Sequence, residues 1–167
     1  MKKYILPITI CGAVFALVLA IFLLTNQNSK SAVSVKNYIC AENGELGVEH
    51  IIALTEISDQ FDLVFYYTSN GQIAANFLVK DESGQYIKLV MTSSQSSDHI
   101  NHIIASSRVL GDCESTLYWG IAQSSDWTIN HPNAHQIMVD DLILAYYLHN
   151  KSLDEEPLDI EFIHRES

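Results

Sequence analysis

The chain is poor in basic residues, in cysteine and in proline. Its 167 residues include nine Lys and Arg against 20 Asp and Glu, with three Cys and three Pro. The net charge of −11 argues against binding to nucleic acid or to an anionic lipid surface, because both repel a negative protein. The sequence also lacks a glycine-rich phosphate loop, a C-x-x-C pair, a G-x-S-x-G elbow and an H-E-x-x-H motif. We therefore predict no cofactor and no catalytic residue.

Charged residues are absent from residues 4–24, and Lys2 and Lys3 precede this apolar run. At about 1.5 Å per residue, a helix of this length spans roughly 30 Å, the thickness of a bilayer core. The basic start predicts a cytoplasmic N-terminus and translocation of the rest of the chain. A cleaved signal peptide and a lipoprotein processed at Cys11 are the alternatives, but no small residues suited to cleavage follow the run. The sequence favours an uncleaved, single-pass anchor in the cell membrane.

The chain that follows the anchor is long enough for one domain and too short for two. We expect a cytoplasmic start at 1–3, a transmembrane anchor at 4–24, a Ser- and Asn-rich tether at 25–36, and an extracytoplasmic β-domain at 37–167. All the acidic residues follow the anchor, which fits a soluble domain held close to a membrane.

Runs rich in aromatic and β-branched residues recur after the tether and predict strands. Asn70-Gly71 predicts a tight hairpin turn, and 92–98 (TSSQSSD) reads as a polar loop. Residues 99–110 fit either a short helix or a strand at 102–110. The other expected strands are 48–54, 61–67, 72–79, 85–91, 115–123, 127–129, 136–139, 142–149 and 158–164. This spacing, with little helix, predicts a mainly β fold: one antiparallel β-sandwich, or a barrel-like domain.

One stretch of these strands has a layout known elsewhere. It contains an aromatic-Gly-aliphatic strand, YWGI at 118–121, then short strands, then a late aromatic strand, LAYY at 144–147. This layout resembles small single-pass, uncharacterised all-β surface proteins of Gram-positive bacteria. The resemblance covers only this part of the chain. It implies a bacterial cell-surface β-domain and no activity or site residues.

Two of the three cysteines, Cys40 and Cys113, belong to the expected outer domain. In an oxidising compartment, one disulfide between them would stabilise the fold by restricting the unfolded chain, by about 4 kcal/mol in the entropic model. Two unrelated free thiols are the alternative. Neither cysteine has a basic neighbourhood that would activate it as a nucleophile.

The histidines invite a comparison with metal ligands. His99 and His102 are three positions apart, and His131 and His135 are four apart, as two ligands on one helical face would be. Pro132 favours a turn over a helix in the second pair, and no Glu completes a zinc motif there. We therefore predict hydrogen-bonded or exposed loop histidines and no metal site.

Aromatic residues offer a route to binding. The adjacent pairs at 66–67 and 146–147 must point to opposite faces of their strands, so one tyrosine of each pair turns away from the core. We name Tyr66, Trp127 and Tyr146 as candidates for a binding face, with packing against another strand as the alternative. The sequence as a whole predicts a membrane-anchored binding module whose partner is another membrane or cell-envelope protein. The competing hypothesis is an envelope hydrolase or metal-dependent enzyme with a site built from loop His and carboxylates.

Overall fold

The computed structural model describes residues 34–42, 47–124, 126–139 and 141–164. The chain divides into two units after Tyr38, and all the strands belong to the second unit, Ile39–Ser167. The predicted anchor at 4–24 lies outside the described residues, as does most of the predicted tether; residues 34–36 of that tether begin a short helix, 34–42. Within the described ranges, no helix has the length and apolar character needed to cross a membrane.

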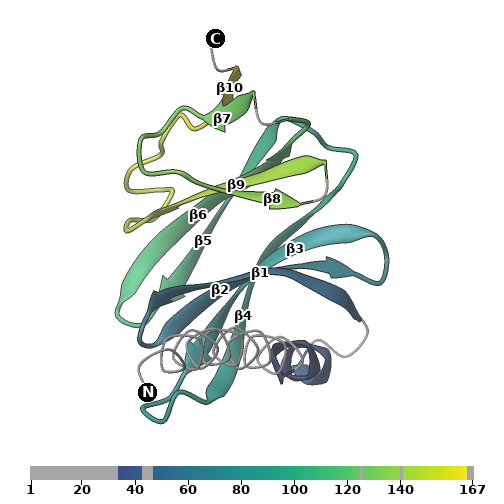
Figure 1. Cartoon of the computed structure of the whole chain (residues 1–167). Coiled ribbons are helices and arrows are strands. Elements are labelled where there is room, and N and C mark those ends of the chain that lie inside the picture. Colours follow the sequence, from purple (N-terminus) through teal and green to yellow (C-terminus); the bar gives the residue numbers. More distant parts are fainter. Residues whose placement is uncertain (1–33, 43–46, 125, 140, 165–167) are drawn as a thin grey trace, which may run out of the picture. The chain divides into compact units, whose positions relative to one another are not determined.

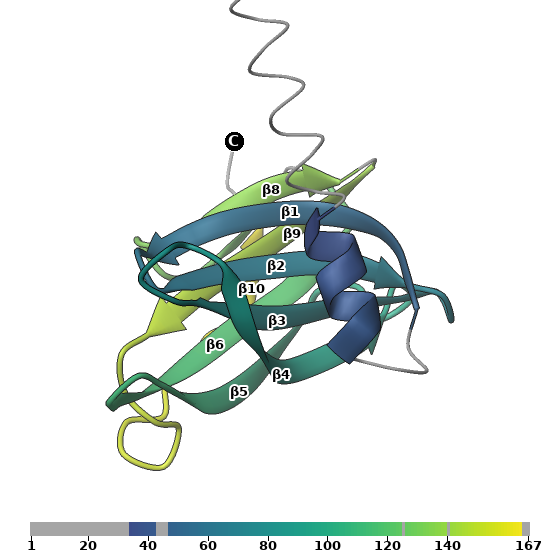
Figure 2. The same ribbon diagram turned by 90° about the horizontal axis from the view of Figure 1, so that it is seen from below.

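The first sheet is an antiparallel meander of four strands in the order of the sequence (Figures 1 and 2). Its strands are β1 (Val48–Ser58), β2 (Phe61–Thr68), β3 (Gln72–Lys80) and β4 (Tyr86–Ser96). The predicted Asn70-Gly71 turn joins β2 to β3, with Gly71 at a φ of 78° that glycine adopts without strain. The side chain of Asp81 organises the next turn by accepting bonds from the backbone N–H groups of Ser83 and Gln85, each at 2.9 Å.

The second sheet also has four antiparallel strands, in the order β5-β6-β9-β8. These are β5 (His102–Leu110), β6 (Cys113–Ala122), β8 (His135–Val139) and β9 (Leu142–His149). Residues 102–110 are therefore a strand, which decides between the two alternatives that the sequence left open. A small sheet pairs β7 (Trp127–Ile129) with β10 (Phe162–His164), so the strand expected at 158–164 forms only at its end.

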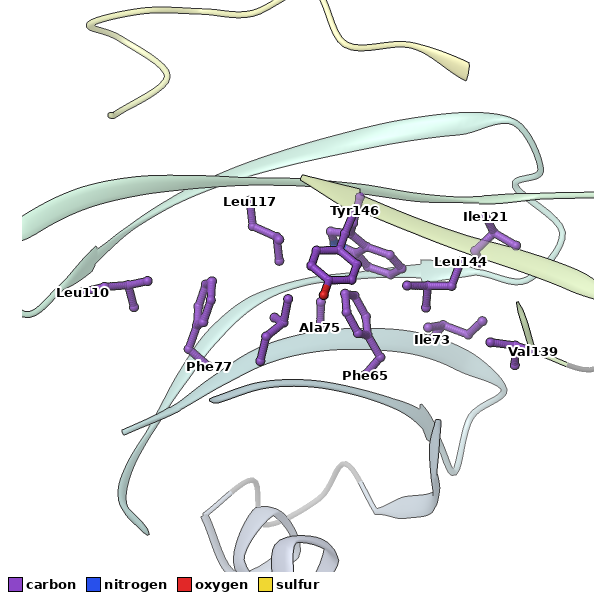
Figure 3. Packing of buried hydrophobic residues seen from close by; sticks show 12 residues of the cluster. Phe65, Ile73, Ala75, Phe77, Leu110, Leu117, Ile121, Val139, Leu144 and Tyr146 are labelled. Carbon is purple, nitrogen blue, oxygen red and sulfur yellow. The ribbon is translucent and has the colours of Figure 1, made fainter. Parts of the chain in front are cut away.

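The two four-stranded sheets share one apolar core. Figure 3 shows Phe65 and Phe77 of the first sheet facing Leu117 and Tyr146 of the second. The Phe65 ring lies 5.6 Å from the Trp119 ring in an edge-to-face arrangement, a geometry that aromatic pairs favour. On its other side, the second sheet packs against the small sheet through a separate apolar cluster, which includes Ile129, Ile143 and Phe162.

The predicted mainly β, antiparallel fold is confirmed, and the barrel-like alternative is wrong. No ladder of backbone hydrogen bonds joins β4 to β5 or β1 to β8 in the described part of the chain. Between β4 and β5, side chains take the place of a ladder. Arg108 donates to the backbone oxygen of Met91 over 2.6 Å and to that of Thr92 over 2.9 Å. These bonds engage two backbone oxygens on the open edge of β4, a part of the edge that would otherwise be free to pair with another chain.

Candidate ligand-binding cavity on the first sheet

Two of the three predicted binding-face residues are buried. Tyr146 is 3% exposed and packs in the core between the sheets, with its ring 5.4 Å from that of Phe65. Its neighbour Tyr147 is the residue that turns outward, because β9 pairs Tyr146 with the core residue Trp119. Tyr147 is covered in turn by His131, whose ring stacks on it at 3.8 Å. The prediction that Tyr146 faces outward is therefore wrong.

The other two candidates differ from each other. Tyr66 points away from the core as expected, yet it is only 1% exposed, and its phenol oxygen accepts a bond from the Asn76 side-chain amide over 2.7 Å. Trp127 is half-buried and meets His164 in an edge-to-face contact at 5.4 Å. Tyr66 therefore cannot present an open aromatic face, and Trp127 presents only part of its ring.

The predicted disulfide between Cys40 and Cys113 is absent, and both thiols are free. Cys113 is exposed at the first position of β6, opposite Leu110 across a hairpin, so its side chain projects from the end of a sheet. Cys40 belongs to the short helix that precedes β1. Sequence spacing carries no information on whether two such positions approach within bonding distance.

The four histidines do not converge. His99 and His102 are exposed at the β4–β5 connection, and His131 and His135 stack on different tyrosines, Tyr147 and Tyr146. Among the residues that the structure describes, no group of three or more His, Cys, Asp or Glu side chains is placed to hold a metal ion.

A cavity of about 190 Å³ opens instead on the outer face of β2, β3 and β4. We call it the hydroxyl cavity, because hydroxyl and amide groups provide most of its polar lining. Its walls are Tyr66, Thr68, Gln72, Ala74, Asn76, Met91, Thr92, Ser93 and Ser94. No lining side chain carries a charge at neutral pH, in a chain whose net charge is −11.

A β-bulge shapes the floor of the hydroxyl cavity. The register between β3 and β4 shifts between Ala75 and Asn76, which leaves Thr92 as the extra residue. The Asn76 side-chain oxygen accepts the Thr92 backbone N–H over 3.1 Å, and the Thr92 hydroxyl donates to the backbone oxygen of Ala75. Together with the bond from Asn76 to Tyr66, these contacts fix the Asn76 amide in one orientation.

The rim of the cavity is held by polar contacts between the strands. The Thr68 hydroxyl is bonded to both backbone groups of Gln72, at 3.0 Å each, and the Ser94 hydroxyl lies 3.1 Å from the side-chain oxygen of Gln72. On the core side, Ser93 accepts the indole N–H of Trp119 over 2.8 Å. The cavity is thus a preformed, hydrogen-bonded depression, which suits a ligand that is itself uncharged and hydrogen-bonding.

Sequence reasoning missed this site because it treated residues 92–98 as a loop. Thr92 to Ser96 continue β4, and the first three of these residues line one wall of the cavity. One signal was present: Asn76 interrupts the apolar run of β3, and asparagine is depleted in strand interiors.

Comparisons of the chain with protein-family models, with curated proteins and with solved structures give no match. A proposal for the function therefore rests on the chemistry of the residues that line the hydroxyl cavity.

Proposed function

We propose that this chain is a membrane-anchored, extracytoplasmic binding module that takes a small, uncharged, hydrogen-bonding ligand in the hydroxyl cavity. The membrane location rests on the apolar run at 4–24 and the preceding lysines. The binding role rests on one observation above all, a buried asparagine amide held rigidly at the floor of an open cavity.

Asn76 is 3% exposed in the middle of β3, where an apolar residue would be the stable choice. Burying an amide costs free energy that its hydrogen bonds only offset, so a fold does not gain stability from this position by default. Residues that break a local rule of this kind concentrate at functional sites. The bulge at Thr92 supports the same interpretation, because bulges occur next to binding sites, where they redirect side chains.

The lining favours binding over hydrolysis. It contains no His, Cys or carboxylate that would serve as a nucleophile or general base. Fixed hydroxyl and amide groups instead match a ligand rich in hydroxyls or amides, and Ala74 and Met91 supply an apolar surface for its carbon skeleton. A charged ligand would lose its hydration without gaining an opposite charge from the lining.

The test uses full-length protein in lipid nanodiscs, with the methyl resonances of Met91 and Ala74 observed by NMR. The probes are glucose and N-acetylglucosamine, each compared with a charged analogue, glucuronate and glucosamine. We expect the neutral sugars to shift both methyl resonances in a saturable manner and the charged analogues to bind more weakly. The proposal is wrong if neither neutral sugar shifts them, or if the charged analogues bind equally well.

A pair of variants ties the binding to the cavity. Ser94 lies on the exposed rim, so Ser94→Leu places an apolar side chain over the opening without disturbing the core. Ser58→Leu makes the same change at an exposed position at the end of β1, outside the lining. We expect the first variant to abolish the methyl shifts and the second to leave them unchanged.

A further inference from the structure

A second concave site lies at one end of the two packed sheets. It encloses about 370 Å³, and we call it the end groove. The end groove is lined by four apolar residues, two lysines, a glutamine and a glycine: Phe61, Val79, Val90, Val109, Lys80, Lys88, Gln60 and Gly111. It shares no residue with the hydroxyl cavity.

The apolar wall of the end groove is continuous with the core. Phe61 and Val90 pack against the core cluster, whereas Val109 is 65% exposed at the outer side of the groove. Gly111 lies beside the Phe61 ring, and its φ of 63° is a backbone conformation that favours glycine. Because Phe61 is only half-buried and Val109 is exposed, the apolar surface of the groove is open to solvent.

The two lysines differ in their partners. Lys80 is held by Asp62 at 2.8 Å and lies 3.8 Å from Glu56, so its charge is already neutralised. Lys88 is exposed and forms no ion pair with any residue in the described ranges. Because β4 pairs Lys88 with Val79, both side chains project from the same face, toward the groove.

One free positive charge beside an apolar wall defines a ligand with one negative group and an apolar chain. Asp59 and Asp112 directly adjoin the lining residues Gln60 and Gly111 in the sequence, and a ligand with several negative charges would be repelled there. A single carboxylate in contact with the Lys88 ammonium group is attracted at a separation well inside the screening length of roughly 8 Å in physiological salt. Most of the affinity would come from the buried apolar chain.

We propose that the end groove binds an aliphatic monocarboxylate, with the carboxylate at the Lys88 ammonium group and the chain along Phe61 and the valines. This site is independent of the sugar-type ligand proposed for the hydroxyl cavity. It gives the module a second specificity, for a short-chain aliphatic acid.

The experiment compares hexanoate with 1-hexanol, which has the same chain and no charge, on full-length protein in nanodiscs. The readout is the set of valine methyl resonances, because Val79, Val90 and Val109 report on the groove and not on partitioning into lipid. We expect hexanoate to shift these three resonances in a saturable manner and to bind more tightly than hexanol. Equal affinity of the two compounds, or no shift at any of the three valines, would overturn the proposal.

Variants separate the charge from the apolar wall. Lys88→Gln should weaken hexanoate binding by about two- to fivefold, as expected for one exposed charge pair, and leave hexanol binding unchanged. Lys151→Gln removes another exposed lysine, outside the groove lining, and should alter neither. Val109→Ser, at an exposed position that the fold tolerates, should weaken both ligands. A Lys88→Gln variant that binds hexanoate with unchanged affinity would show that the carboxylate is not recognised at this lysine.

Discussion

Lys80 donates a hydrogen bond to the buried carboxylate of Asp62 over 2.8 Å, across neighbouring strands of the first sheet. The second oxygen of Asp62 accepts the Tyr86 hydroxyl over 2.7 Å, so both oxygens are satisfied. The hydrogen bond to Asp62 raises the pKa of Lys80 above its ordinary value of 10.5. Burial, and then the bond to Asp62, raise the pKa of Tyr86 well above its ordinary value of 10.0.

This cluster predicts a loss of stability at alkaline pH. Both raised pKa values mean that the folded state holds its protons more tightly than the unfolded state. The stability they contribute is therefore complete below about pH 10 and declines as the pH rises above the unfolded values of 10.0 and 10.5. We expect the urea concentration at the midpoint of unfolding to be lower at pH 11 than at pH 8.

The Asp62→Asn variant identifies the source of that loss. It removes the close partner of Lys80 and leaves the weaker contact with Glu56 at 3.8 Å, so we expect about 3 kcal/mol of destabilisation at pH 8, the lower end for a broken buried pair. The fall between pH 8 and pH 11 should also become smaller. The exposed Asp98→Asn variant should keep the full alkaline loss. If Asp62→Asn unfolds with the same alkaline sensitivity as the wild type, the cluster is not its cause.

Acid should loosen the segment that follows β9. The Lys151 ammonium group donates a hydrogen bond to the Glu156 carboxylate, and this bond lowers the pKa of Glu156 below its ordinary value of 4.5. Glu156 therefore stays ionised in the folded state until the pH falls through that lowered value, where its contribution to stability is lost. Hydrogen exchange of the amides at 151–158, corrected for the intrinsic rates, should accelerate as the pH falls below 4.5. A Glu156→Gln variant should lack this acceleration, and wild-type exchange that is equally slow above and below that pH would contradict the prediction.

The strands and tight turns could be predicted from the sequence, whereas the hydroxyl cavity could not. The dense aromatic run at 61–67 and the Asn70-Gly71 turn carry their own conformational signals, and β2 and its hairpin form there. The strand character of Thr92 to Ser96 has no such local signal. It depends on pairing with β3 and on the bond from Trp119 to Ser93, between residues far apart in the chain.

The orientation of the tyrosines shows the same limit. Alternation along β9 requires Tyr146 and Tyr147 to face opposite ways, but only the pairing of β9 with β6 decides which one enters the core. Tyr66 shows a further limit, because it faces outward as expected and is still buried. Orientation follows from the strand, whereas exposure depends on what covers the sheet.

The thiols provide a direct chemical test. Because Cys40 and Cys113 are free and Cys113 is exposed, alkylation of the folded, unreduced protein should modify Cys113 rapidly and Cys40 more slowly. Peptide mapping by mass spectrometry distinguishes the two sites, and prior reduction should not increase the yield at either. A Cys113 peptide that is modified only after reduction would show that this thiol is bonded in the native protein.

Gly120 of β6 lies in close contact with the backbone of β5. A Cβ atom there would lie 2.2 Å from the backbone oxygen of His102 and 2.9 Å from the Phe162 ring. A backbone oxygen held in a ladder cannot move aside, so Gly120→Ala must shift β5 away from β6 or displace β10. We expect a destabilisation of about 3 kcal/mol, the upper part of the range for overpacking, measured as a lower midpoint of urea unfolding.

Gly47→Ala is the matched control for Gly120→Ala, because its new methyl group would meet only the Ser69 side chain, at 3.2 Å from the hydroxyl oxygen. Equal midpoints for the two variants would mean that β5 and β6 are not packed this closely in solution.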